Sequence, residues 1–205
     1  MKKGRFLLIA VLFSSILLVY GCGEDGGVTP PTVDKLIKQG WAKFDAGNDA
    51  GASADFKAAI GLSADTNEAY LGLGWAELRQ SHAGLAENAF ETYLAKFSDS
   101  NDAKAGLALA YHAQDKFEDA TDKDAIDMAE EVLSSEPSWN FSPHDPNIDY
   151  RDIALVLAES YYETADFSQS LTVVQQYFDG TFNPDLGTDE GRAQLAQKLR
   201  DLYTG

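Results

Sequence analysis

Apolar residues recur every three to four positions from Val33 to the end of the chain, and this segment holds few clusters of β-branched residues. Short polar breaks, such as Gly47-Asn48, interrupt the pattern at regular intervals. A half-buried helix has this period, whereas a half-buried strand alternates apolar and polar residues. The pattern therefore predicts an all-α domain of short helices over residues 33–205.

Small and aromatic residues recur within this domain at a spacing of 34 positions. One column holds Gly40, Gly74 and Ala108, a second holds Ala52, Ala86 and Ala120, and a third holds Phe56 and Phe90. This period resembles that of the tetratricopeptide repeat (TPR), in which each unit is a pair of antiparallel helices. The resemblance implies a right-handed α-solenoid of stacked TPR-like hairpins.

The later part of the domain departs from the 34-residue spacing. The second helix of the third unit is predicted at residues 125–132, about five residues late, and a fourth unit is predicted over residues 157–177. A proline-containing excursion over residues 138–149 separates the two units. A last helix after Asn183-Pro184 has a polar face that suits a cap. We expect three to four hairpins and a C-terminal capping helix, with a compact helical bundle as the alternative.

The first residues resemble a bacterial lipoprotein signal. Three basic residues precede an apolar stretch from Phe6 to Tyr20, which is short for a membrane span, and Gly21-Cys22 follows. Leu18-Val19-Tyr20-Gly21-Cys22 resembles the lipobox, at which cleavage precedes a lipid-modified cysteine. The resemblance implies a signal peptide over residues 1–21, lipidation of Cys22, and a lipid-anchored linker over residues 22–32. The alternatives are an uncleaved anchor helix or a buried cysteine.

The excess of acidic residues argues against one class of partner, nucleic acid. The chain has 33 acidic and 16 basic residues, a net charge of −17, which becomes −20 when the three basic residues of the leader are removed. Such a surface repels phosphate backbones, so nucleic acid is excluded as a partner. The single cysteine allows no internal disulfide. We expect a cell-envelope protein, favouring the outer membrane.

The sequence offers no catalytic motif and no cofactor-binding motif. We therefore expect no enzyme activity, no cofactor and no metal. Asp145, Asn147 and Asp149 match half of a calcium loop, but Tyr150 replaces the required glycine and Val156 the final glutamate. Asp149 is instead expected to cap a helix that begins at Tyr150. The acids around Asp124, Asp127 and Glu131 are interpreted as a solvated face.

The first helices of the units are expected to line the concave side, as in TPR proteins. Their predicted groove residues are Ile37, Trp41, Phe44, Leu71, Trp75, Leu78, Leu109, His112 and Tyr162. This stripe predicts a hydrophobic groove that suits an apolar or amphipathic peptide. The alternative is internal packing, with Trp139 and Phe141 of the excursion filling the groove.

Two functions follow from this pattern. The first is a lipid-anchored scaffold or assembly factor that binds an envelope protein or peptide in the groove, as the TPR resemblance implies. The second is a lipoprotein that captures a glycan or another small molecule, with Trp41, Trp75 and Tyr162 stacking on it.

Overall fold

The computed structural model describes residues 30–97, 99–118, 123–142 and 144–204. Residues 31–205 form one compact unit. Its helices are α1 (Val33–Asp45), α2 (Asp49–Leu62), α3 (Asn67–Arg79), α4 (Ala83–Lys96), α5 (Asn101–His112), α6 (Ala125–Ser135), α7 (Tyr150–Glu163), α8 (Phe167–Tyr177) and α9 (Asp189–Thr204). Two short strands, β1 (Asn140–Phe141) and β2 (Asp145–Asp149), lie between α6 and α7.

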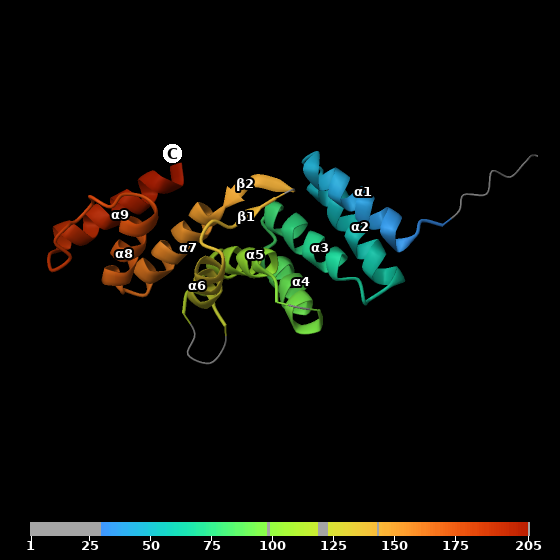
Figure 1. The fold of residues 1–205 in the computed structure, drawn as a ribbon, viewed down its shortest axis with the longest axis horizontal. Coiled ribbons are helices and arrows are strands. Elements are labelled where there is room, and N and C mark those ends of the chain that lie inside the picture. The colour runs from blue at the N-terminus through green and yellow to red at the C-terminus, as the bar shows by residue number, and fades with distance from the viewer. Residues whose placement is uncertain (1–29, 98, 119–122, 143, 205) are drawn as a thin grey trace, which may run out of the picture. The chain divides into compact units, whose positions relative to one another are not determined.

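The helices pack as consecutive antiparallel pairs. Each odd-numbered helix from α1 to α7 contacts the helix that follows it, and each second helix from α2 to α6 contacts the first helix of the next pair. The first helices also contact one another in the order α1, α3, α5, α7, α9, which we call the first-helix row. Figure 1 shows this order from α1 in blue to α9 in red. The predicted all-α solenoid of helix pairs with a final single helix is confirmed.

Polar side chains set where several helices begin. The side chains of Thr32, Asn48, Ser100, Asp124, Asp149 and Asp166 accept hydrogen bonds from backbone N–H groups of the first turn. Those N–H groups have no partner inside the helix, so each cap stabilises its helix end. Asp149 forms a reciprocal capping box with Asp152 at the start of α7, as the sequence indicated.

The ends of the first helices preserve the 34-residue repeat. Gly47, Ser81 and Asp115 have φ values of 74°, 61° and 58°, and Ala165 has the equivalent conformation after α7. A left-handed residue just past a helix end turns the chain and satisfies the last carbonyl groups. Non-glycine residues rarely adopt this conformation, so its recurrence marks one turn used in every pair.

Two phenylalanine rings fill slots between first helices that lack side chains. Phe56 lies between Gly40 of α1 and Gly72 of α3, and a Cβ atom on Gly72 would meet its Cζ at 2.3 Å. Phe90 lies in the same way between Gly74 and Gly106. Both rings are fully buried. These glycines are therefore required by close approach between helices.

The third unit has a different distribution of side-chain size. When the first helices are aligned at the left-handed residue that follows each of them, Ala108 and Val156 occupy the columns of the paired glycines. Ala129 follows Ala125 as Phe56 follows Ala52, so it occupies the column of Phe56 and Phe90. Ala108 and Ala129 are fully buried, and Val156 is 5% exposed. Compared with the first two units, the first helices here carry larger side chains at the contact, and the second helix carries a smaller one.

A polar contact also recurs between consecutive pairs. It joins a residue of a second helix to a residue of the following first helix, in the pairs Lys57–Glu77 at 2.6 Å, Glu91–Tyr111 at 2.8 Å and Glu130–Tyr161. In the first pair the acid lies on the first helix, and in the other two it lies on the second helix. The position of the contact is kept while its chemistry changes.

In the part of the chain that the structure describes, every helix is too short or too polar to cross a membrane. The predicted signal peptide, Cys22 and nearly all of the linker lie outside the described residues, and so does Ala120 of the second column.

Candidate functional site

The predicted groove residues fall into two groups. Ile37, Trp41, Phe44 and Trp75 are 0–7% exposed and belong to the core. The other apolar members, Leu71, Leu78, Leu109 and Tyr162, are half-buried against it, and His112 keeps 26% of its side chain exposed. The expectation that Trp41 and Trp75 line an open groove is therefore wrong, and the alternative of internal packing describes them.

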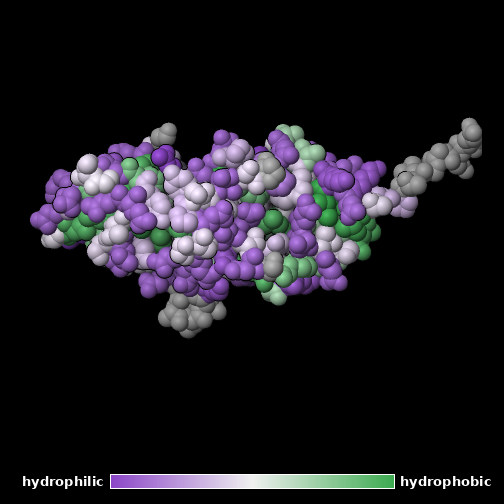
Figure 2. All heavy atoms as spheres, viewed as in Figure 1, coloured by the Kyte–Doolittle hydropathy of each residue, from purple (hydrophilic) through white to green (hydrophobic). Residues whose placement is uncertain are grey.

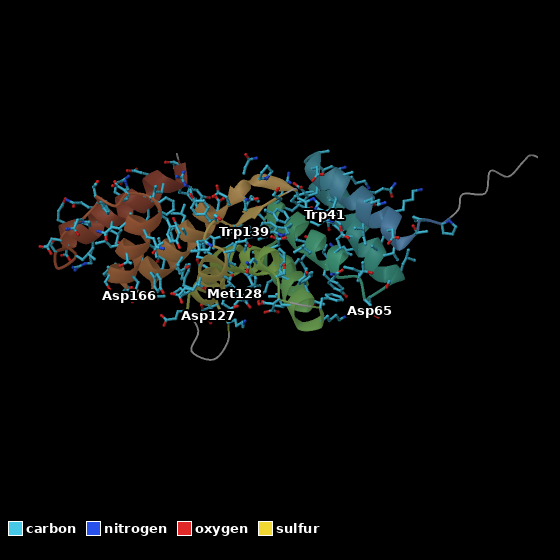
Figure 3. The ribbon with its side chains drawn as sticks, viewed as in Figure 1. Trp41, Asp65, Asp127, Met128, Trp139 and Asp166 are labelled. Carbon is cyan, nitrogen blue, oxygen red and sulfur yellow. The ribbon has the colours of Figure 1, made fainter. Side chains whose placement is uncertain are left out.

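The physical reason is a segment that covers them, the described residues 139–142 and 144–149, which we call the strap. Phe141 stacks on Trp75 with ring centroids 4.1 Å apart, and His144 stacks on Trp41 with centroids 3.5 Å apart. Trp139 also stacks on Trp75 at 6.4 Å. Trp139 and Phe141 are each 1% exposed. The labels of Trp139 and Trp41 mark the two ends of this covered stretch in Figure 3.

Polar contacts hold the strap at both ends. The indole Nε1 of Trp139 donates to Asp102 Oδ1 at 2.9 Å. Burial raises the pKa of Asp102 above its ordinary value, although this hydrogen bond opposes the shift. At the other end, Arg79 Nη1 lies 4.0 Å from Asp145 Oδ2, and its guanidinium lies 4.1 Å from the centre of the Phe44 ring. The strap is thus part of the folded structure of the first three helix pairs.

The first-helix row carries a pocket beyond the strap. A hollow of about 380 Å³ lies between the ends of α5 and α7 and the middle of α9. His112, Phe117, Glu159, Tyr162, Leu199 and Arg200 are among its lining residues. The structure therefore brings together two of the predicted groove residues, His112 and Tyr162, on the part of the row that the strap does not reach.

Three polar side chains in this pocket, those of His112, Glu159 and Tyr162, have fixed contacts. His112 Nε2 lies 3.2 Å from Glu159 Oε2, and the His112 ring packs edge-on against Phe117 with centroids 5.4 Å apart. The Tyr162 hydroxyl donates to the carbonyl oxygen of Arg192 at 3.4 Å. These contacts orient one aromatic wall and one carboxylate toward the same space.

The pocket carries a net negative charge. Asp115, Glu159 and Glu163 line it against the single arginine, Arg200. Arg200 donates to Gln197 Oε1 at 2.8 Å. Among the described residues, neither Asp115 nor Glu163 forms an ion pair with a basic side chain. The pocket therefore combines aromatic walls with two carboxylates, those of Asp115 and Glu163, that pair with no basic side chain in the described part of the chain.

Two other hollows are lined by second helices as well as first helices. One of about 760 Å³ is lined by α4, α5 and the start of α6. Its Lys116 lies 2.5 Å from Glu87 Oε1, and its Lys123 lies 3.2 Å from Glu131. The other, of about 390 Å³, is lined by α6, α7 and α8, and there the Tyr161 hydroxyl donates to Glu130. The pocket at α9 differs from both hollows because only first helices and the segment after α5 line it.

One buried polar cluster brings together residue types that also occur in hydrolases. Ser53 Oγ donates to Glu77 Oε1 at 2.5 Å, and His82 Nδ1 lies 2.8 Å from Glu77 Oε2. Serine and histidine both contact the carboxylate, whereas a serine nucleophile needs its hydroxyl on the imidazole. Lys57 completes the cluster. Its geometry is that of a buried carboxylate with hydrogen-bond donors around it.

The other acidic candidates have local partners. Asp145 Oδ1 accepts from the backbone and side-chain amides of Asn147, and Asp149 caps α7. Asp124 is 4% exposed and caps α6, so its interpretation as part of a solvated face is wrong. Within the described residues, no three His, Cys, Asp or Glu side chains gather closely enough to hold a metal ion.

The pocket residues outside the first-helix stripe were not among the predicted site residues. Phe117 lies after α5, and Leu199 and Arg200 lie on the predicted capping helix. The signal that could have found them is the position of α9 in the row, because a cap that follows α7 must add side chains beside Tyr162.

No protein-family model matches the chain. No curated protein matches it significantly.

Proposed function

We propose that this protein is a lipid-anchored scaffold or assembly factor of the cell envelope, and that it binds a segment of a partner protein in the pocket between α5, α7 and α9. Solenoids of helix pairs expose long surfaces that suit protein binding. Because a fold alone does not fix function, the proposal depends on the site. The outer membrane is the favoured location, because Gly23 and not an aspartate, the inner-membrane retention signal of some bacterial lipoproteins, follows Cys22.

One observation carries the proposal: the pocket is a hollow on the first-helix row beyond the stretch that the strap occupies. The strap shows that extended chain fits against this row, because it places Trp139, Phe141 and His144 along α5, α3 and α1. A partner segment at α7 and α9 would use the same row further on. Its binding residues would be His112, Phe117, Glu159 and Tyr162.

A site-specific crosslinking experiment tests this proposal. Ala196 lines the pocket, whereas Ala58 is exposed on α2 and lies outside it. A photoreactive benzoylphenylalanine at Ala196 is expected to crosslink one envelope protein in cells, and the same group at Ala58 is not. The purified partner should then bind the wild-type chain at least about tenfold more tightly than Ala196→Trp, which fills the hollow. Equal crosslinking at both positions, or equal affinity, would contradict the proposal.

The capture of a small molecule by stacked aromatics has less support. Of its three stacking residues, Trp41 and Trp75 are buried beneath the strap, and the Tyr162 ring packs against Phe167 with centroids 5.1 Å apart. A stacking ligand needs the face of a ring, and two of the three rings already stack on residues of the strap.

A further inference from the structure

The geometry points to a cationic side chain, an arginine or a lysine of the partner segment, as the group that the pocket between α5, α7 and α9 binds. This inference rests on the proposed function and adds the chemistry of its ligand. It is carried by the charges and the aromatic walls of the pocket together.

The carboxylates have the arrangement that a cation requires. Glu159 is oriented by His112, since the imidazole Nε2 lies 3.2 Å from its Oε2. Glu163 lies one helical turn further along α7, so both side chains reach the same face of that helix. Asp115 approaches from the turn after α5. A guanidinium or ammonium group between them would find several acceptors, and bidentate binding favours the planar guanidinium.

The walls supply the second requirement. Phe117 and Tyr162 present aromatic rings, and Leu199 adds apolar surface. The stem of an arginine or lysine packs against apolar surface, and its charged head is attracted to a ring face within about 6 Å. An acidic side chain would be repelled by the same carboxylates.

The charge of the whole chain acts in the same direction. The net charge is −17, and the face of the molecule in Figure 2 is largely hydrophilic. A negative surface raises the association rate of a positively charged partner and lowers that of an acidic one. A basic segment is therefore favoured before contact as well as within the pocket.

A titration with a minimal probe tests the inference. N-acetyl-arginine methylamide is added to the isotope-labelled full chain in detergent, and backbone amide signals of residues 112–117 and 159–163 are followed by NMR. We expect a saturable shift of these signals that weakens when salt is raised. The neutral citrulline analogue, which has nearly the same shape, should bind at least about threefold more weakly because it lacks the charge.

Matched variants assign the effect to the pocket. Glu163→Gln should weaken binding of the arginine probe about two- to fivefold, and the double variant Glu159→Gln/Glu163→Gln about tenfold. Glu190→Gln on exposed α9 removes the same charge outside the pocket and should leave the affinity unchanged. Equal binding of arginine and citrulline, no binding of either, or an equal loss with Glu190→Gln would overturn the inference.

The two proposals can fail separately. A partner that crosslinks at Ala196 and keeps its affinity when its basic residues are neutralised would overturn the cation site and leave the scaffold function in place. An arginine probe that binds the pocket, combined with no partner at Ala196, would overturn the scaffold function alone.

Discussion

The ring of Phe141 stacks on the indole of Trp75, with ring centroids 4.1 Å apart and ring planes inclined by 21°. Trp75 belongs to a helix of the second pair, and Phe141 belongs to a segment that follows the third pair. Both side chains are 1% exposed. The chain thus supplies its own occupant for the first part of the first-helix row, and the pocket at α9 lies beyond it.

Removing that occupant should destabilise the protein. Phe141→Ala deletes a fully buried ring against Trp75, and we expect the free energy of unfolding to fall by about 3–5 kcal/mol. Acrylamide should then quench tryptophan fluorescence more strongly, because Trp75 loses its cover. Ser142→Ala changes an exposed neighbour and should shift stability by less than about 0.5 kcal/mol. Unchanged stability in urea for Phe141→Ala would show that the strap does not pack on the row in solution.

The helix pairs were predictable because the residues that pack them together recur at a fixed spacing. Gly74 and Phe90 recur from the preceding unit at the same spacing, since every unit must solve the same packing problem between two first helices. The turn at Asp115 follows from the same period, although the residue type changes there. Local spacing is sufficient to locate such contacts.

The strap and the pocket were harder to predict because they depend on contacts between distant parts of the chain. Nothing in the spacing of Trp139 or Phe141 indicates that they pack on the first-helix row, and internal packing could be offered only as an alternative. The pocket joins Phe117 to Leu199, which belong to different units. A repeat pattern predicts the contacts that every unit makes. The strap follows the third unit alone and the pocket requires the C-terminal helix, so neither feature repeats.

The slot that holds Phe90 gives a sharp stability prediction. In Gly74→Ala the new Cβ would lie 2.5 Å from Phe90 Cε1, so the ring or the helices must move. Overpacking of this kind costs about 1–3 kcal/mol. Gly61→Ala is the control, because nothing lies within 4 Å of its added Cβ and alanine is the better helix former. We expect thermal unfolding midpoints to fall for Gly74→Ala and to stay or rise for Gly61→Ala, and the reverse order would contradict the slot.

The proposed lipid anchor can be tested by replacing the cysteine that would carry the acyl chains. Cys22 is the single cysteine of the chain. Cys22→Ser should move the protein from the membrane fraction to the soluble fraction and abolish incorporation of labelled palmitate. A lipid anchor with two or more acyl chains binds membranes durably, so the expected shift is nearly complete. Failure of labelled palmitate to enter the wild-type chain would remove the lipoprotein hypothesis.

The contact between Tyr161 and Glu130 predicts a delayed phenol titration. Burial, and then the hydrogen bond to the Glu130 carboxylate, raise the pKa of Tyr161 well above its ordinary value of 10.0. The wild type and Tyr161→Phe are therefore compared by spectrophotometric titration of the folded proteins. Their titration curves should coincide near pH 10, and the additional ionising tyrosine of the wild type should appear only at strongly alkaline pH. The loss of this charge-assisted hydrogen bond should cost about 1–3 kcal/mol. A difference that appears near pH 10 would mean that the contact does not form.

Glu77 links the first two helix pairs and gives the molecule a pH dependence. It is 2% exposed, and burial opposes its ionisation, but hydrogen bonds from Lys57, Ser53 and His82 outweigh this effect and lower the pKa of the carboxyl below 4.5. A lowered pKa in the folded state means that the ionised carboxylate stabilises the fold at pH values above 4.5. This stabilisation is lost as the pH falls through the folded-state pKa.

Glu77→Gln should therefore be less stable than the wild type by about 1–3 kcal/mol near pH 7, because Lys57 and Ser53 lose their charged acceptor. The difference should shrink at an acidic pH well below 4.5, where the pH has fallen through the lowered pKa and the wild-type carboxyl becomes protonated. Urea unfolding at both pH values measures it. Glu68→Gln removes an exposed carboxylate from the same helix and should show little difference at either pH. If the Glu77→Gln deficit is as large at low pH as at neutral pH, the contribution of Glu77 comes from packing and not from its charge.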